Sequence, residues 1–127
     1  MKKINLITLS LSMLALSACK KNGTGGENNI AAFPKHHGTE IPNATVFIKY
    51  GASELPGTSA SDFDDSRIAV KEGSGAAHAH FDGLLKGNYY IYSVGYDSTV
   101  KETVSGGIAV KITTKSGSQD VEVPVTE

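Results

Sequence analysis

The sequence has a single cysteine, so the chain offers no second thiol for an intramolecular disulfide bond. Tryptophan is absent, and the 12 basic residues nearly cancel the 13 acidic ones. Without a basic excess, the chain lacks the field that holds nucleic acid and has no polybasic helix for a membrane surface. The apolar stretch at residues 4–16 is shorter than the roughly 20 residues that span a bilayer.

Catalytic signatures are also missing from the sequence. No G-x-S-x-G elbow marks a serine hydrolase, and no H-E-x-x-H helix marks a zinc protease. The glycines from Gly23 to Gly26 neither follow an expected strand nor open a helix, so they do not predict a phosphate loop. We therefore expect no enzymatic activity and no cofactor.

Helical periodicity is missing from the chain after the first 19 residues, whereas glycine is abundant, with 14 residues. Short β-branched runs favour strands joined by turns. Expected strands cover residues 45–50, 66–70, 77–81, 89–94, 108–113 and 121–125. Pro34 and Pro124 lack an amide donor, so we expect their strands to start there or to lie at sheet edges. The pattern predicts an all-β fold, with one immunoglobulin-like sandwich of about seven strands over residues 30–127.

The N-terminal segment has the composition of a targeting sequence. Lys2 and Lys3 precede the apolar stretch, which ends in Leu16-Ser17-Ala18-Cys19. This ending resembles the lipobox of bacterial lipoprotein signals. The resemblance implies that residues 1–18 are removed and that Cys19 carries a diacylglyceryl group and an added acyl chain such as palmitate. The alternative is an ordinary signal peptide with a chance cysteine near its end.

Residues 19–29 are rich in glycine and asparagine and lack large apolar side chains. Such a composition buries too little surface to offset chain entropy, so we expect a flexible tether. Lys20 and Lys21 stand where, by resemblance to enteric lipoproteins, an aspartate would retain the protein at the inner membrane. We therefore expect a lipid anchor in the outer membrane of the cell envelope. The protein then lies on either the periplasmic face or the cell-surface face of that membrane.

A strand at residues 89–94 contains three of the five tyrosines. Gly87 is expected to reverse the chain before it. Tyr89 and Ile91 share one face, so we expect both in the core, with the Tyr89 hydroxyl bonded to a partner at the rim. Tyr90 and Tyr92 share the opposite face, where they either line a binding surface or pack beneath a neighbouring loop.

The same region has a characteristic spacing of residues, namely Phe81, Gly83, Leu84, Gly87, Tyr89, Ile91, Gly95 and Tyr96. It resembles the F-x-G-L-x-x-G-x-Y-x-L…G-Y signature of carboxypeptidase regulatory-like domains. Residues 38–46 similarly resemble the G-x-P-L-x-G-A-x-V entry to their second strand. The resemblance implies a transthyretin-like sandwich, as in Cna-B domains, over roughly residues 33–125. Similar domains occur in many bacterial lipoproteins without an assigned activity.

Histidines offer a candidate metal site. His78 and His80 form H-x-H, so both side chains project from one face of a strand. With His36 or His37 nearby, they form a three-histidine site of the kind that suits zinc or copper. The alternative is solvated or partly buried strand histidines without a metal.

Two further sets of polar residues are candidates for surface sites. Asp62 and Asp64, in an acidic loop, either join Tyr90 and Tyr92 in a binding surface, bind calcium, or simply remain solvated. Ser98, within Asp97-Ser98-Thr99, resembles the acceptor for O-glycosylation in some Gram-negative envelopes, although turn chemistry explains the same residues.

Three functional hypotheses follow from these observations. The first is a membrane-anchored, non-catalytic lipoprotein that acts as a binding or accessory module for an envelope protein or glycan. The second is a periplasmic metal-binding protein that uses its histidines. The third is an architectural spacer in an envelope assembly. None of the three involves nucleic acid.

Overall fold

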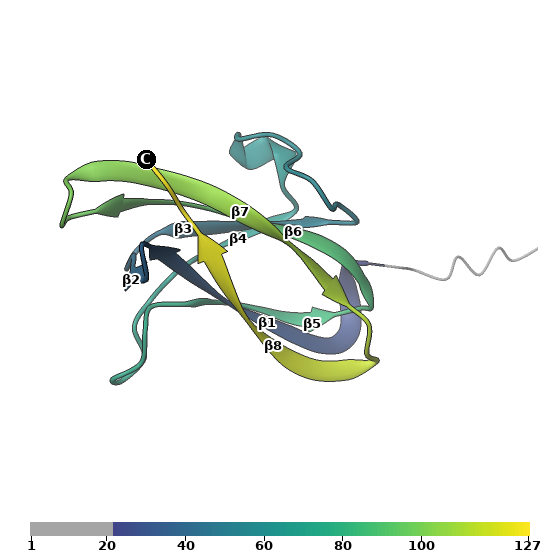
Figure 1. The fold of residues 1–127 in the computed structure, drawn as a ribbon. Coiled ribbons are helices and arrows are strands. Elements are labelled where there is room, and N and C mark those ends of the chain that lie inside the picture. The colour runs from purple at the N-terminus through teal and green to yellow at the C-terminus, as the bar shows by residue number, and fades with distance from the viewer. Residues whose placement is uncertain (1–21) are drawn as a thin grey trace, which may run out of the picture.

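A computed structural model describes residues 22–127, which form a β-sandwich of eight strands in two layers (Figure 1). The predicted all-β sandwich is therefore confirmed. The expected signal sequence, the predicted lipid-attachment residue Cys19 and the first residues of the expected tether lie outside the described part. Helical structure within residues 22–127 is confined to one 3-10 turn, η1 (Ala60–Asp62), and no helix there is long and apolar enough to cross a bilayer.

The first sheet is built around β1 (Thr24–His36). The last strand, β8 (Ser116–Pro124), runs parallel to β1 along one side. On the other side, β5 (Ala79–Leu84) pairs with the first part of β1, and the short β2 (Thr39–Glu40) pairs with its end. The central strand thus joins the start, the middle and the end of the chain.

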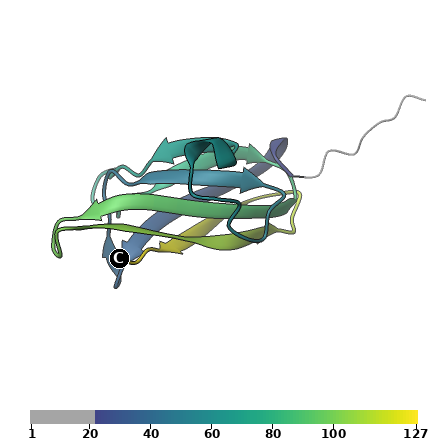
Figure 2. The ribbon, with the colours of Figure 1, turned by 90° about the horizontal axis from the view of Figure 1, so that it is seen from above.

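The second sheet has the order β4-β3-β6-β7 and is antiparallel throughout. Its strands are β4 (Asp65–Ile68), β3 (Thr45–Tyr50), β6 (Gly87–Asp97) and β7 (Glu102–Ile112). The predicted strands at residues 45–50, 66–70, 89–94 and 108–113 all belong to this sheet. Figure 2 shows this sheet from above, with the loop between β3 and β4 lying over its outer face; this segment, residues 51–64, is called the 60s loop below.

The side chains that point inward from alternate positions of the strands fill the space between the two sheets. Alternate residues of β1 are buried, as the period of two requires. Val110 and Ile112 of β7 point inward, and Ile108 packs against the core, so these three apolar residues share one face of the strand. Other side chains that fill this core include Ile30, Ile41, Val46, Ile48, Phe81, Leu84, Tyr89, Ile91, Val104, Val123 and Val125.

Tyr89 is fully buried, and its hydroxyl has the rim partners that the sequence predicted. The hydroxyl accepts a hydrogen bond from the Gly23 amide at 2.9 Å and donates to the Leu85 carbonyl at 2.6 Å. Gly87 has φ +146°, and a Cβ there would meet the Asn22 side-chain oxygen at 1.8 Å. Glycine is therefore required at this reversal, as the sequence predicted.

The expected boundary between tether and domain at Ile30 is wrong by six residues. Strand β1 begins at Thr24, so residues 24–29 belong to the sheet. Hydrogen bonds rather than apolar burial hold this segment. The buried Asn28 amide donates to the carbonyls of Leu84, Thr114 and Lys115 at 3.0–3.1 Å. A polar segment can therefore join a sheet when nearby carbonyls satisfy it.

The expectation for Pro34 is also wrong, because this residue lies inside the central strand and is fully buried. The ladder from β1 to β5 ends at Ala32, and the ladder to β2 starts at Lys35. Pro34 thus lies at the junction, where a missing amide donor interrupts neither ladder, and its carbonyl accepts from the Ile41 amide at 3.1 Å. Pro124 fits its prediction, since it ends β8 at the sheet edge.

Candidate functional site

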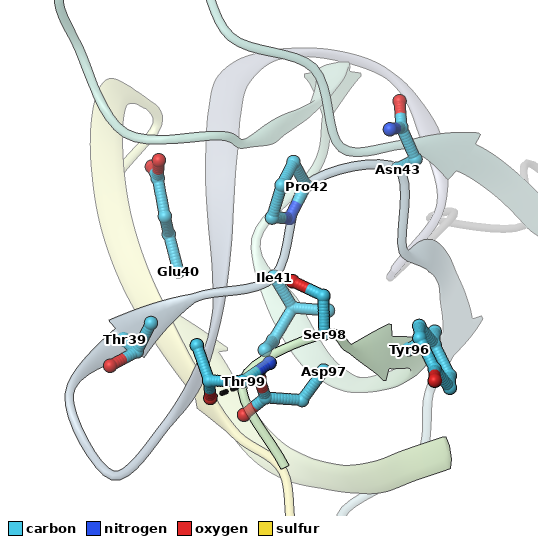
Figure 3. A pocket seen from close by; sticks show the side chains of 9 residues that line it. All are labelled: Thr39, Glu40, Ile41, Pro42, Asn43, Tyr96, Asp97, Ser98 and Thr99. Carbon is cyan, nitrogen blue, oxygen red and sulfur yellow. Dashed lines mark hydrogen bonds between the residues drawn. The ribbon is translucent and has the colours of Figure 1, made fainter. Parts of the chain in front are cut away.

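A surface pocket of about 510 Å³ lies at one end of the sandwich, between the segment that connects β2 to β3 and the turn after β6 (Figure 3). The Tyr96 side chain stands at its rim and is 57% exposed, the largest exposed fraction among the large apolar residues of the described part. The residues that line it are Thr39, Glu40, Ile41, Pro42, Asn43, Tyr96, Asp97, Ser98 and Thr99.

Asp97 shapes the floor of this pocket. Its Oδ1 atom accepts hydrogen bonds from the Thr99 hydroxyl at 2.6 Å and the Thr99 amide at 2.9 Å. These bonds close the turn after β6. Ser98 lies at the exposed tip of that turn, so its hydroxyl is accessible, as the predicted acceptor serine requires.

Beneath the pocket, His36 supports Asp97 from inside the sandwich. The His36 Nδ1–H group donates to Asp97 Oδ2 at 2.7 Å, and both side chains are buried. The two Thr99 bonds and this imidazole bond favour the carboxylate, with the Thr99 hydroxyl contributing most, and they lower the Asp97 pKa to about 2. Glu127 Oε2 lies 3.3 Å from His36 Nε2 but is not aligned for a hydrogen bond.

The structure separates His36 from the other predicted metal ligands. Because alternate residues of β1 face the core, His36 points inward, whereas His78 and His80 lie on the outer face of the same sheet. Their ring nitrogens gather with Glu72 instead, and His36 groups with His37 and Glu127. The three-histidine arrangement is therefore wrong, although the H-x-H pair itself faces one way as predicted.

Tyr92 packs beneath a loop, which was one of the two alternatives for the tyrosine pair. Its ring stacks on Phe63 of the 60s loop at 5.6 Å and lies 6.3 Å from Phe47. Only 7% of Tyr92 is exposed. Tyr90 is half-buried, and its ring covers Gly107 of β7, where a Cβ would approach it to 2.6 Å. Both rings thus contribute to packing of the second sheet.

Asp62 and Asp64 stabilise the 60s loop. Asp62 Oδ2 accepts from the amide of Ser59, the N-cap residue of η1, at 3.0 Å, as in a capping box. Asp64 Oδ2 accepts from the Tyr50 amide at 2.7 Å and lies 3.6 Å from Lys49 Nζ. These bonds give both carboxylates structural partners, and neither residue belongs to a group of metal-ligating atoms within residues 22–127.

Among the residues that line the pocket, only Ser98 was predicted from the sequence as a candidate site residue. Ile41-Pro42-Asn43 was visible as a strand boundary and Tyr96 as part of a fold signature, but no local pattern brings these segments together. Sheet pairing does so, because β3 and β6 are neighbours and Thr45 lies opposite Val94. Glu72 was missed as a partner of His78 because a turn, rather than sequence spacing, brings the two together.

Comparison with known proteins gives no family assignment, since no family model, curated protein or solved structure matches the chain. The fold itself is an all-β sandwich of two sheets.

Proposed function

We propose that the protein is a non-catalytic lipoprotein of the bacterial outer membrane, anchored by lipid on Cys19, whose sandwich binds an envelope glycan. The lipobox-like sequence Leu16-Ser17-Ala18-Cys19 supports the anchor. The resemblance of residues 81–96 to carboxypeptidase regulatory-like domains supports a non-catalytic, accessory role.

The observation that carries this proposal is that the start of the described chain and the pocket lie at opposite ends of the sandwich. The described chain starts at Asn22, whose amide donates to the Lys86 carbonyl and whose side-chain oxygen accepts from the Asn88 amide. The pocket lies beside Asp97, at the other end of β6. The eleven residues of β6 make ten steps of about 3.3 Å each, so its two ends lie about 33 Å apart. A lipid on Cys19 would therefore leave the pocket facing away from the membrane.

The side chains of the pocket suit a sugar. Tyr96 is largely exposed at the rim of the pocket, and amphipathic tyrosine is a favoured contact residue because it combines apolar area with a hydroxyl. Hydroxyl and amide groups from Thr39, Asn43 and Ser98 line the same pocket. A few polar groups beside an aromatic surface are the usual composition of a small-ligand site.

The test is binding of the purified protein to an array of bacterial envelope polysaccharides. We expect a subset of glycans to bind and the Tyr96→Ala variant to lose about fivefold or more in affinity, since a stacked aromatic contact contributes on the order of 1 kcal/mol. Leu55→Ala removes another exposed apolar side chain, on the 60s loop, and is the matched control. Equal binding by wild type and Tyr96→Ala would contradict the assignment of this pocket.

A further inference from the structure

A second cluster of chemically capable side chains lies outside the pocket, on the outer face of the first sheet. Glu72, His78 and His80 each offer one ligand atom, and these atoms lie within 4.8 Å of one another. The two histidine Nε2 atoms are 2.8 Å apart. The Glu72 carboxylate oxygens lie 3.8 Å from His78 Nε2 and 3.9 Å from His80 Nε2.

The backbone fixes which nitrogen of His78 is free. His78 Nδ1 lies 2.8 Å from the Ala76 carbonyl oxygen, which can only accept, so Nδ1 carries the proton. In the neutral ring, Nε2 therefore presents its lone pair toward His80 and Glu72. Stacking on Phe33, with ring centroids 4.9 Å apart, holds the imidazole in this orientation. A metal-binding histidine commonly has its other ring nitrogen bonded to a backbone carbonyl in this way.

The spacing of the three donors is close to what one ion requires. With metal–nitrogen bonds of about 2.0–2.1 Å, two donors on the same ion lie about 2.9–3.4 Å apart. The histidine pair at 2.8 Å meets this with a small separation of the rings. Glu72 must approach by about 0.5 Å, and its side chain, 63% exposed, is free to do so.

A tight connection brings the glutamate to the histidines. Val70 pairs with His78, and between them the chain reverses through a turn in which the Gly75 amide donates to the Glu72 carbonyl. Gly73 supplies the positive φ of +62° that this turn needs. The neighbouring ammonium group of Lys71 pairs with Glu40, so it does not compete for Glu72.

Charge on the same face also favours a cation. On β1, Ala31 lies opposite His80 on one side and opposite Asp120 on the other, so only a small side chain separates these two residues along the row. The Asp120 carboxylate adds to the negative potential that Glu72 creates.

We propose that Glu72, His78 and His80 bind one divalent transition-metal ion, Zn²⁺ or Cu²⁺, at the outer face of the first sheet. Two imidazoles with one carboxylate suit these ions, whereas Ca²⁺ and Mg²⁺ prefer oxygen ligands. Binding replaces the hydrogen bond between the two histidines and requires His80 to carry its proton on Nδ1. Three protein ligands leave a coordination position for water or a further ligand.

The test is calorimetric titration of the full-length protein, in detergent, with Zn²⁺ and separately with Cu²⁺, and Ca²⁺ as the negative control. We expect one ion per chain with micromolar or tighter affinity. The substitutions His80→Ala and Glu72→Gln change exposed side chains, so the fold should survive, and each should weaken binding by at least about tenfold. Thermal unfolding without metal verifies that each variant folds.

The control variant is His37→Ala, which removes an exposed histidine of the other cluster. It should bind metal as the wild type does. Millimolar affinity, binding that survives His80→Ala, or binding lost in His37→Ala would each overturn the proposal. Nitrogen chemical shifts of the histidine rings give a second measurement, because metal should move the His78 and His80 Nε2 resonances and leave His36 unchanged.

Discussion

Tyr89 links the start of the described chain to the second sheet through its buried hydroxyl, which bonds to Gly23 and Leu85. Its place on the β6 face predicted a core position with a hydroxyl at the rim, and both features are present. Its partner Gly23 was not predictable, because that glycine lies in a segment whose composition suggests a tether. Local alternation identifies a buried ring, but only the tertiary fold determines which amide reaches its hydroxyl.

The hydrogen bonds of Asp97 predict how its carboxyl group affects the stability of the fold as the pH changes. Its pKa in the fold, about 2, lies below the ordinary value of 3.8. A lowered pKa means that the carboxylate stabilises the folded state above about pH 4, and that this contribution is lost as the pH falls toward 2. We therefore expect Asp97→Asn to be less stable than wild type at pH 7, and this difference to shrink between pH 4 and pH 2.

Thermal unfolding at a series of pH values measures the Asp97 effect. Asp82→Asn changes an exposed carboxylate of β5 and is the matched control, which should unfold nearly as the wild type does at every pH. A difference between wild type and Asp97→Asn that stays constant down to pH 2 would contradict the proposed role of the Thr99 and His36 hydrogen bonds.

Strand β1 is the element at which sequence reasoning was weakest. Strands with clear alternation, such as β3 and β7, are recognisable because their apolar residues recur with period two. The first part of β1 has no such pattern. Its buried Asn28 gains stability from three carbonyl acceptors contributed by distant segments. Composition alone therefore predicts a spacer for the first part of β1, although this segment is part of the sheet.

A truncation tests the role of this segment. A chain that starts at Ile30 loses the Gly23 amide, the Asn28 amide and the first part of the ladder between β1 and β8. Each buried group left without its partner costs about 1–3 kcal/mol. We expect its midpoint of thermal unfolding to lie at least about 10 °C below that of a chain starting at Asn22. Equal midpoints would show that residues 22–29 are dispensable for folding.

At the scale of the whole molecule, sequence patterns predicted the two-layer architecture, and pairing between distant strands determined the sites. The pocket unites two turns that lie about fifty residues apart in the sequence, and the proposed metal site unites a turn with a strand. Both lie where connections between strands meet, away from the end at which the described chain begins. The proposed function combines this polarity with an anchor on Cys19.

The most direct test of this account is the intact mass of the mature protein, extracted from the membranes of a Gram-negative bacterium that expresses the full-length chain. We predict a chain that starts at Cys19, carries a diacylglyceryl group and an additional acyl chain, and sediments with the membranes, whereas Cys19→Ala carries no lipid. A chain cleaved elsewhere, with an unmodified Cys19 and found in the soluble fraction, would contradict the proposed anchor and the orientation of the sandwich that depends on it.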